Sequence, residues 1–133
     1  MSQQNPQSPR KRILVAEDDP EIAELLARIL GAHYDVAVVN DGHRALAVLS
    51  KPPVPDLVLL DVMMPGVDGF GVAQRLRLLH PNRKIPVIFV TARDAPLDVI
   101  QGIQAGARHY ITKPFKVKDV LDKVARAVGG PLP

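Results

Sequence analysis

The chain has 133 residues, enough for one domain with a sizeable core, and 47% of them are apolar. It contains no cysteine, which excludes disulfides, zinc–thiolate sites and thiol catalysis, and no stretch is long and apolar enough to cross a membrane. The net charge of +3 comes from three basic residues at 10–12, because residues 13–133 hold 14 basic and 14 acidic side chains. Direct nucleic-acid binding is therefore not expected.

The two ends of the chain differ in composition from the middle. Residues 1–9 are rich in Gln, Asn, Ser and Pro, so residues 1–11 are expected to form a disordered tail and not a signal peptide. Residues 12–128 are expected to form the folded domain, and residues 129–133 a C-terminal tail or the start of a linker. The absence of cysteine and of a membrane segment favours a cytoplasmic protein with no membrane partner.

Strand-like and helix-like segments alternate five times along the chain. The strands are short apolar runs rich in β-branched residues, and the helices carry apolar side chains at 3.6-residue spacing. In chain order, the expected elements are a strand at 12–16, a helix that follows Pro20 and is stopped by Gly31, a strand at 36–39, a helix at 43–49, a strand at 57–60, a helix at 70–79, a strand at 87–90, a helix at 96–105, a strand at 109–112 and a helix at 116–128.

This alternation predicts an α/β fold with a doubly wound, five-stranded parallel sheet flanked by five helices. Right-handed crossovers favour the strand order 2-1-3-4-5. In the last helix, the apolar positions Val117, Val120 and Val124 are expected to face inward.

Polar residues follow four of the predicted strands. Glu17-Asp18-Asp19 follow the first, Asp61 the third, Thr91 the fourth and Lys113 the fifth. Because the carboxyl ends of parallel strands meet at one edge of a sheet, these side chains are expected to share a pocket. Crowded carboxylates repel one another unless a cation joins them, and Mg²⁺ prefers such oxygen ligands. The pattern therefore indicates a divalent metal and phosphoryl chemistry, with Asp61 as the candidate nucleophile.

Each of these residues also has a simpler interpretation when it is taken alone. An acidic triplet before a helix can be a solvated cap, and Asp19 beside Pro20 is expected to fill that role. An aspartate at a strand end such as Asp61 often starts a turn. Thr91 can be a mere β-former, and Lys113 a solvated cation.

The sequence closely resembles the receiver domains of two-component response regulators, of the type found in chemotaxis, over about residues 12–128. Four segments carry the resemblance in the family's order: ILVAEDDP at 13–20, PDLVLLDVMMPGVDG at 55–69, IPVIFVTA at 85–92 and GARHYITKPF at 106–115. The resemblance implies the flavodoxin-like receiver fold. It also implies that Asp61 is the phosphoacceptor, with Mg²⁺ or Mn²⁺ bound by Asp18, Asp61, the backbone carbonyl of Met63 and, through water, Glu17.

The resemblance further implies a switch. Thr91 would move toward the phosphoryl group, Tyr110 would turn inward, and Lys113 would contact the phosphate before a cis bond to Pro114. The expected output face is formed by the helix at 96–105, the strand at 109–112 and the last helix. A sensor histidine kinase or histidine phosphotransfer protein would be the donor, and a downstream protein or an effector domain of the same chain the target. The domain would catalyse only its own phosphorylation and dephosphorylation.

The chain departs from the family pattern at a few positions. Arg108 and His109 stand where many winged-helix regulators of the family have two acids, which argues against a dimer that depends on them. Arg93 and Met63 occupy positions that tune dephosphorylation in the family, and both are bulky enough to shield an acyl phosphate.

Three other classes of protein compete with the receiver-domain interpretation. A phosphatase of the haloacid dehalogenase type would need an acid where this chain has Met63, and a flavodoxin-like flavin binder would need a phosphate cradle where it has Glu17-Asp18-Asp19. The remaining alternative is a phosphorylation-independent pseudo-receiver that acts as an interaction module. Such a domain usually lacks part of the acidic set, the hydroxyl or the lysine, and none of these is missing here.

Overall fold

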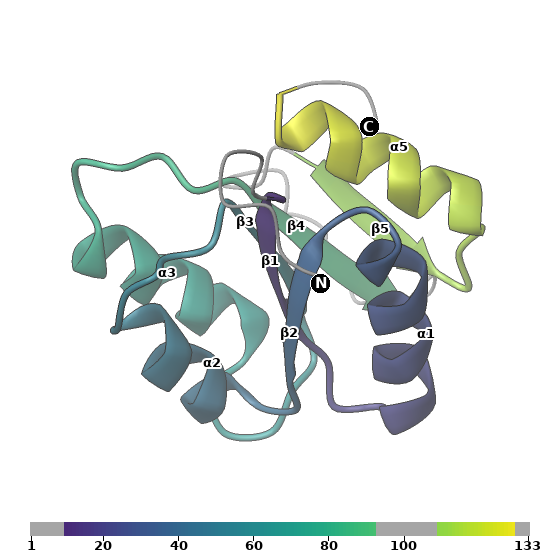
Figure 1. The fold of residues 1–133 in the computed structure, drawn as a ribbon. Helices are drawn as coiled ribbons and strands as arrows, with labels where there is room; N and C mark the ends of the chain where they lie inside the picture. Colours follow the sequence, from purple (N-terminus) through teal and green to yellow (C-terminus); the bar gives the residue numbers. More distant parts are fainter. Residues whose placement is uncertain (1–9, 93–108, 130–133) are drawn as a thin grey trace.

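The computed structural model describes residues 10–92 and 109–129. Five parallel strands form one sheet in the order β2-β1-β3-β4-β5, which confirms the expected topology (Figure 1). The elements are β1 (Arg12–Ala16), α1 (Pro20–Gly31), β2 (Asp35–Val39), α2 (Gly42–Leu49), β3 (Leu57–Asp61), α3 (Gly69–Leu79), β4 (Val87–Ala92), β5 (His109–Lys113) and α5 (Val117–Ala127). The helix expected at 96–105, together with Arg93 and Arg108, lies outside the described residues.

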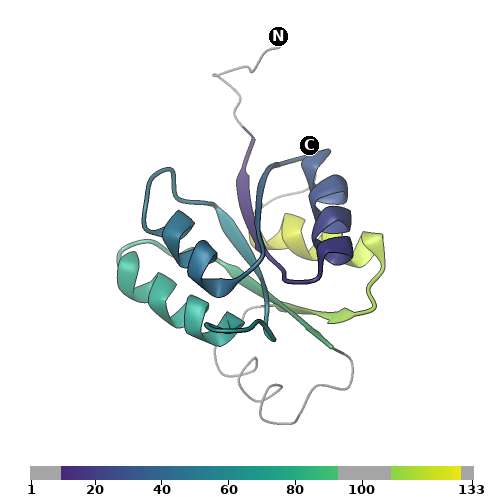
Figure 2. The same ribbon diagram turned by 90° about the horizontal axis from the view of Figure 1, so that it is seen from below.

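Helices cover the sheet on both faces. Helices α1 and α5 lie on one face, and α2 and α3 lie on the other (Figures 1 and 2). Alternate residues of the central strand β3 serve the two cores, since Leu57 and Leu59 pack with α1 and α5 whereas Val58 and Leu60 pack with α2 and α3. This double burial explains why the central strands are continuous apolar runs.

Aspartates cap the first three helices of the described chain. Asp19 accepts a hydrogen bond from the backbone N–H of Glu21 (2.9 Å), as expected for a cap of α1. Asp41 caps α2 and Asp68 caps α3 in the same way. These caps fix where each helix begins, close to the carboxyl edge of the sheet.

The structure corrects some details of the expected elements. Strands β4 and β5 are longer than expected, so Thr91 and Lys113 lie within the last paired residues of their strands. The inward position expected for Val117 is wrong, because its side chain is 44% exposed. Val117 is the first residue of α5, and residues 116–119 at this end of the helix are all exposed, whereas Val120 and Val124 are buried. None of the helices within 10–92 and 109–129 is long and apolar enough to cross a membrane.

Candidate metal and phosphoryl site

Three carboxylates meet at the carboxyl edge of the sheet. Glu17 follows β1 and Asp61 ends β3, and these neighbouring strands are in register, with Ala16 opposite Leu60. One carboxylate oxygen each from Glu17, Asp18 and Asp61 lies within 4.8 Å of the others. Glu17 and Asp61 are buried, whereas Asp18 is exposed. The structure therefore brings together the acids that the sequence placed at separate strand ends.

A lysine at the end of the edge strand β5 also contacts this cluster. Lys113 Nζ lies 3.0 Å from Glu17 Oε1 and 3.4 Å from Asp61 Oδ2. The bond to Pro114 is cis, as the resemblance implied. The sequence did not predict the pairing of Lys113 with Glu17, because the lysine was expected to contact the phosphate. No local pattern signals a contact between residues that are 96 positions apart.

The pKa of Asp61 is raised to about 8, and burial is the largest cause. Hydrogen bonding with Glu17 and Asp18 and the negative charge of Glu17 also raise the pKa, while the charge of Lys113 lowers it. Burial alone lowers the pKa of Lys113, but Glu17 and Asp61 outweigh this effect, so its pKa is raised and the lysine stays charged. One cation thus faces three acids, and the site carries excess negative charge whenever all three are ionised.

The raised pKa of Asp61 predicts how the metal-free protein responds to pH. Between about pH 4 and pH 8 the folded state holds a proton on Asp61 that the unfolded state releases, so the free energy of unfolding should fall as pH rises through this range. Denaturant titrations in chelator at several pH values measure the slope. The matched variant Asp61→Asn should have a flatter profile, and identical slopes for both proteins would contradict the assignment.

The donor atoms of the cluster suit a hard divalent cation. Magnesium takes oxygen ligands, commonly one or two carboxylates plus waters, and an acidic set of this size offers them. Glu17 Oε1 is buried and, although it lies near Lys113 Nζ, accepts no hydrogen bond of favourable geometry from the described residues. A hollow of about 500 Å³ opens over this edge, with Asp18, Asp61, Met63 and Lys113 among its lining residues. A buried carboxylate oxygen that accepts no hydrogen bond within the described part of the chain, beside an open hollow, fits a bound cation.

Met63 lies immediately beside the cluster. Its side chain is 59% exposed, and its backbone N–H donates to Asp61 Oδ1 (3.1 Å). This hydrogen bond holds the start of the loop after β3 against the carboxylate, which places the Met63 backbone next to the acidic hollow.

The two residues expected to act as a switch occupy different environments. Thr91 is buried at the end of β4, and its Oγ1 has no hydrogen-bond partner among the described residues. Tyr110 lies on β5 opposite Phe89 and is 48% exposed. The structure therefore places Thr91 near the acidic edge and leaves Tyr110 outside the site.

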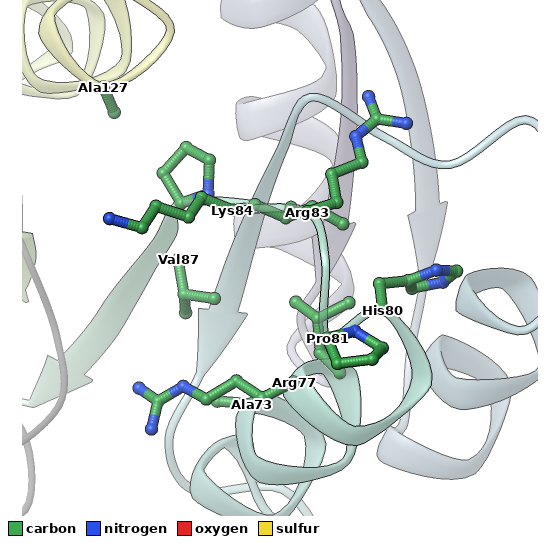
Figure 3. Close-up of a pocket in the computed structure, with 11 residues that line it drawn as sticks. Ala73, Arg77, His80, Pro81, Arg83, Lys84, Val87 and Ala127 are labelled. Carbon is green, nitrogen blue, oxygen red and sulfur yellow. The ribbon is translucent and has the colours of Figure 1, made fainter.

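A larger hollow of about 640 Å³ lies at the opposite edge of the sheet, between the start of β4 and the ends of α3 and α5 (Figure 3). Its described lining includes Arg77, Arg83 and Lys84 and no carboxylate. The basic side chains point in different directions and do not converge on one centre (Figure 3). Because cations repel a metal ion, the smaller hollow and not this one is the candidate site.

Comparisons of this chain with known proteins all indicate the same family. The model of the response regulator receiver domain matches residues 13–125. The DNA-binding response regulator MtrA of Mycolicibacterium smegmatis is 42% identical over 116 residues, which is 86% of this chain and 49% of that protein. The regulator RpaA of Synechocystis is 46% identical over 114 residues, with 85% and 47% covered. The chain thus spans about half the length of these curated relatives.

Solved structures agree with the sequence comparison. The receiver domain of the sensor histidine kinase PA1611 of Pseudomonas aeruginosa, with a magnesium ion coordinated in its active-site cleft, has a TM-score of 0.81 and 29% identity over 91% of this chain and 99% of that one. The signal receiver domain of a histidine kinase of Syntrophus aciditrophicus has a TM-score of 0.78 and 37% identity, with 89% of each chain covered.

Proposed function

The chain belongs to the receiver domains of two-component response regulators, which are phosphorylated on an aspartate, and from this we propose that Asp61 is the residue that accepts the phosphoryl group. The observation that carries this proposal is the position of Asp61. It is buried at the carboxyl end of the central strand, with a lysine 3.4 Å from Oδ2 and two further acids beside it. The substitution Asp61→Asn tests this proposal, because it should abolish phosphorylation.

The chemistry is the transfer of one phosphoryl group to a carboxylate. An ionised oxygen of Asp61 attacks phosphorus, the bond between phosphorus and the donor breaks, and the donor leaves with the electron pair. The product is an acyl phosphate, and the donor is released as the imidazole of a histidine or, with acetyl phosphate, as acetate. Lys113 is positioned to pair with the transferred group as a point charge, because its ammonium already contacts Asp61.

The acidic cluster is proposed to hold Mg²⁺, with Mn²⁺ as a substitute. Asp18 and Asp61 would bind the ion directly, Glu17 through water, and Met63 through its backbone carbonyl. When bound, the ion supplies positive charge that offsets the negative charge of the transferring group. The clustered oxygens and the unsatisfied Glu17 Oε1 support this assignment.

A divalent cation should stabilise the folded chain, and Asp18→Ala should remove that gain. Binding to the folded state alone adds about 2.7 kcal/mol at about a hundred times the dissociation constant. Thermal melts with and without MgCl₂ measure the gain. Asp35→Ala, at an exposed position where β2 begins at the opposite edge, is the matched control and should keep the full effect. An unchanged gain in Asp18→Ala would place the metal elsewhere.

Phosphorylation is proposed to act through Thr91 and Tyr110. The unpartnered, buried hydroxyl of Thr91 is free to bond a phosphoryl oxygen, and Tyr110 is half exposed, so its ring is not locked in the core. The output face would comprise the expected helix at 96–105 together with β5 and α5. A sensor histidine kinase or phosphotransfer protein would supply the group, and a protein target or an effector domain in the same chain would read the change. This domain itself is not proposed to bind nucleic acid or to turn over another substrate.

A further inference from the structure

The first turn of α2 lies directly against the loop that follows Asp61. We call residues 62–68 the acceptor loop. Two consecutive residues of α2 face two consecutive residues of this loop: Gly42 lies against Val67, and the ring of His43 lies over Gly66. The established features of the site do not account for this contact, because none of these four residues belongs to the acidic cluster.

The approach at Gly42 is too close for any other residue. A Cβ atom added to Gly42 would lie 2.1 Å from the backbone oxygen of Val67 and 2.8 Å from the Val67 Cβ. The first of these atoms belongs to the backbone, so no side-chain rotation can relieve the overlap, and either the loop or the helix has to move. Gly42 does not have a positive φ, so the close approach and not backbone conformation explains the glycine.

The helix side of this contact is firmly held. Asp41 caps α2 by accepting from the Arg44 N–H (2.7 Å), and Ala45 is fully buried in the core. The preceding strand is tied to the acidic cluster, because the backbone N–H of Glu17 donates to the Val39 carbonyl (3.0 Å). A clash at Gly42 is therefore expected to displace the acceptor loop and not α2.

Hydrogen bonds hold both ends of the acceptor loop. At its start the Met63 N–H donates to Asp61 Oδ1 (3.1 Å), and at its end the Gly69 N–H donates to the Val62 carbonyl (3.0 Å). A short loop with both ends tied cannot absorb a shift at Val67 locally. A shift at Val67 is therefore expected to reach Met63, which lines the acidic hollow.

We propose that Gly42 is a positioning residue for the metal and phosphoryl site: by admitting Val67 against α2, it keeps the Met63 backbone in the arrangement that binds the divalent cation next to Asp61. This inference rests on the proposed function. It assigns to the start of α2 a role at the site although α2 contributes no group to the acidic cluster.

The test compares Gly42→Ala with Gly31→Ala. Gly31 ends α1, and a Cβ added there meets no atom within 4 Å among the described residues, so the same chemical change is made without a clash. Two quantities are measured by NMR: the Met63 amide resonance without metal and the dissociation constant for Mg²⁺. In Gly42→Ala the Met63 amide resonance should shift, because the hydrogen bond from its N–H to Asp61 Oδ1 is lost. The dissociation constant for Mg²⁺ should rise about tenfold. Gly31→Ala should leave both at wild-type values.

Each outcome of this experiment supports or overturns the proposed role of Gly42. If Gly42→Ala only lowers stability, with the Met63 resonance and the Mg²⁺ constant unchanged, the glycine is merely structural and the proposal is overturned. If Gly42→Ala does not fold, Val67→Gly loosens the same contact without overlap, because it removes the Val67 Cβ that faces Gly42. Wild-type values in that variant overturn the proposal as well. If the wild-type chain binds no Mg²⁺, the proposed metal site fails, while the Met63 resonance still tests the role of Gly42.

Discussion

Asp61→Asn should abolish the increase in mass that acetyl phosphate and Mg²⁺ produce in the wild-type chain. An amide oxygen at this position lacks the charge needed to attack phosphorus, so no acyl phosphate forms. Intact-protein mass spectrometry measures the shift, and fragmentation after trapping the acyl phosphate locates it. The loss should be complete, because Glu17 and Asp18 are proposed to hold the metal and not to attack phosphorus.

The loss of phosphorylation in Asp61→Asn should not result from unfolding of the chain. The pKa of Asp61 is about 8 in the folded chain, so near neutral pH the metal-free folded state must hold a proton that the unfolded state releases. A neutral amide at this position avoids that cost. The metal-free variant should therefore be at least as stable as the wild type near neutral pH. Asp35→Asn, on the exposed start of β2, should be phosphorylated normally. A mass shift that persists in Asp61→Asn would refute the assignment, and a wild-type chain that no donor or kinase phosphorylates would instead support the pseudo-receiver alternative.

Thr91→Ala should separate phosphorylation from signal output. Asp61 keeps its lysine and its neighbouring acids in this variant, so it should still accept the phosphoryl group. The response at Tyr110 should be mostly lost, because the buried hydroxyl that would bond the phosphoryl oxygen is absent. Resonances of Tyr110 with and without beryllofluoride, a mimic of the acyl phosphate, measure the response.

Thr112→Ala is the matched control for this experiment. Thr112 pairs directly with Thr91 across β4 and β5, but its side chain is exposed and lies outside the acidic hollow. The control should respond to beryllofluoride like the wild type. If the Tyr110 resonances of Thr91→Ala also respond like those of the wild type, Thr91 serves only as a β-strand former. The proposed coupling between Thr91 and Tyr110 is then wrong.

The amino-acid sequence determined much of the fold because its signals are local. Apolar runs of strand length, helical spacing and separating prolines and glycines define the elements within a few residues, and Asp19 was recognisable as a cap from its neighbour Pro20. The acidic cluster was also accessible, because a parallel sheet brings the carboxyl ends of β1 and β3 to the same edge and so joins Glu17 to Asp61.

Only the tertiary structure decided how these groups interact. The pairing of Lys113 with Glu17, the raised pKa of Asp61 and the contact of Gly42 with Val67 all depend on distances between segments far apart in the chain. The exposure of Val117 has the same origin, because helical spacing gives the direction of a side chain but not whether the sheet extends beneath it. Periodicity is a property of neighbours in sequence, whereas burial, electrostatic coupling and steric overlap act through space and exist only once the chain is packed.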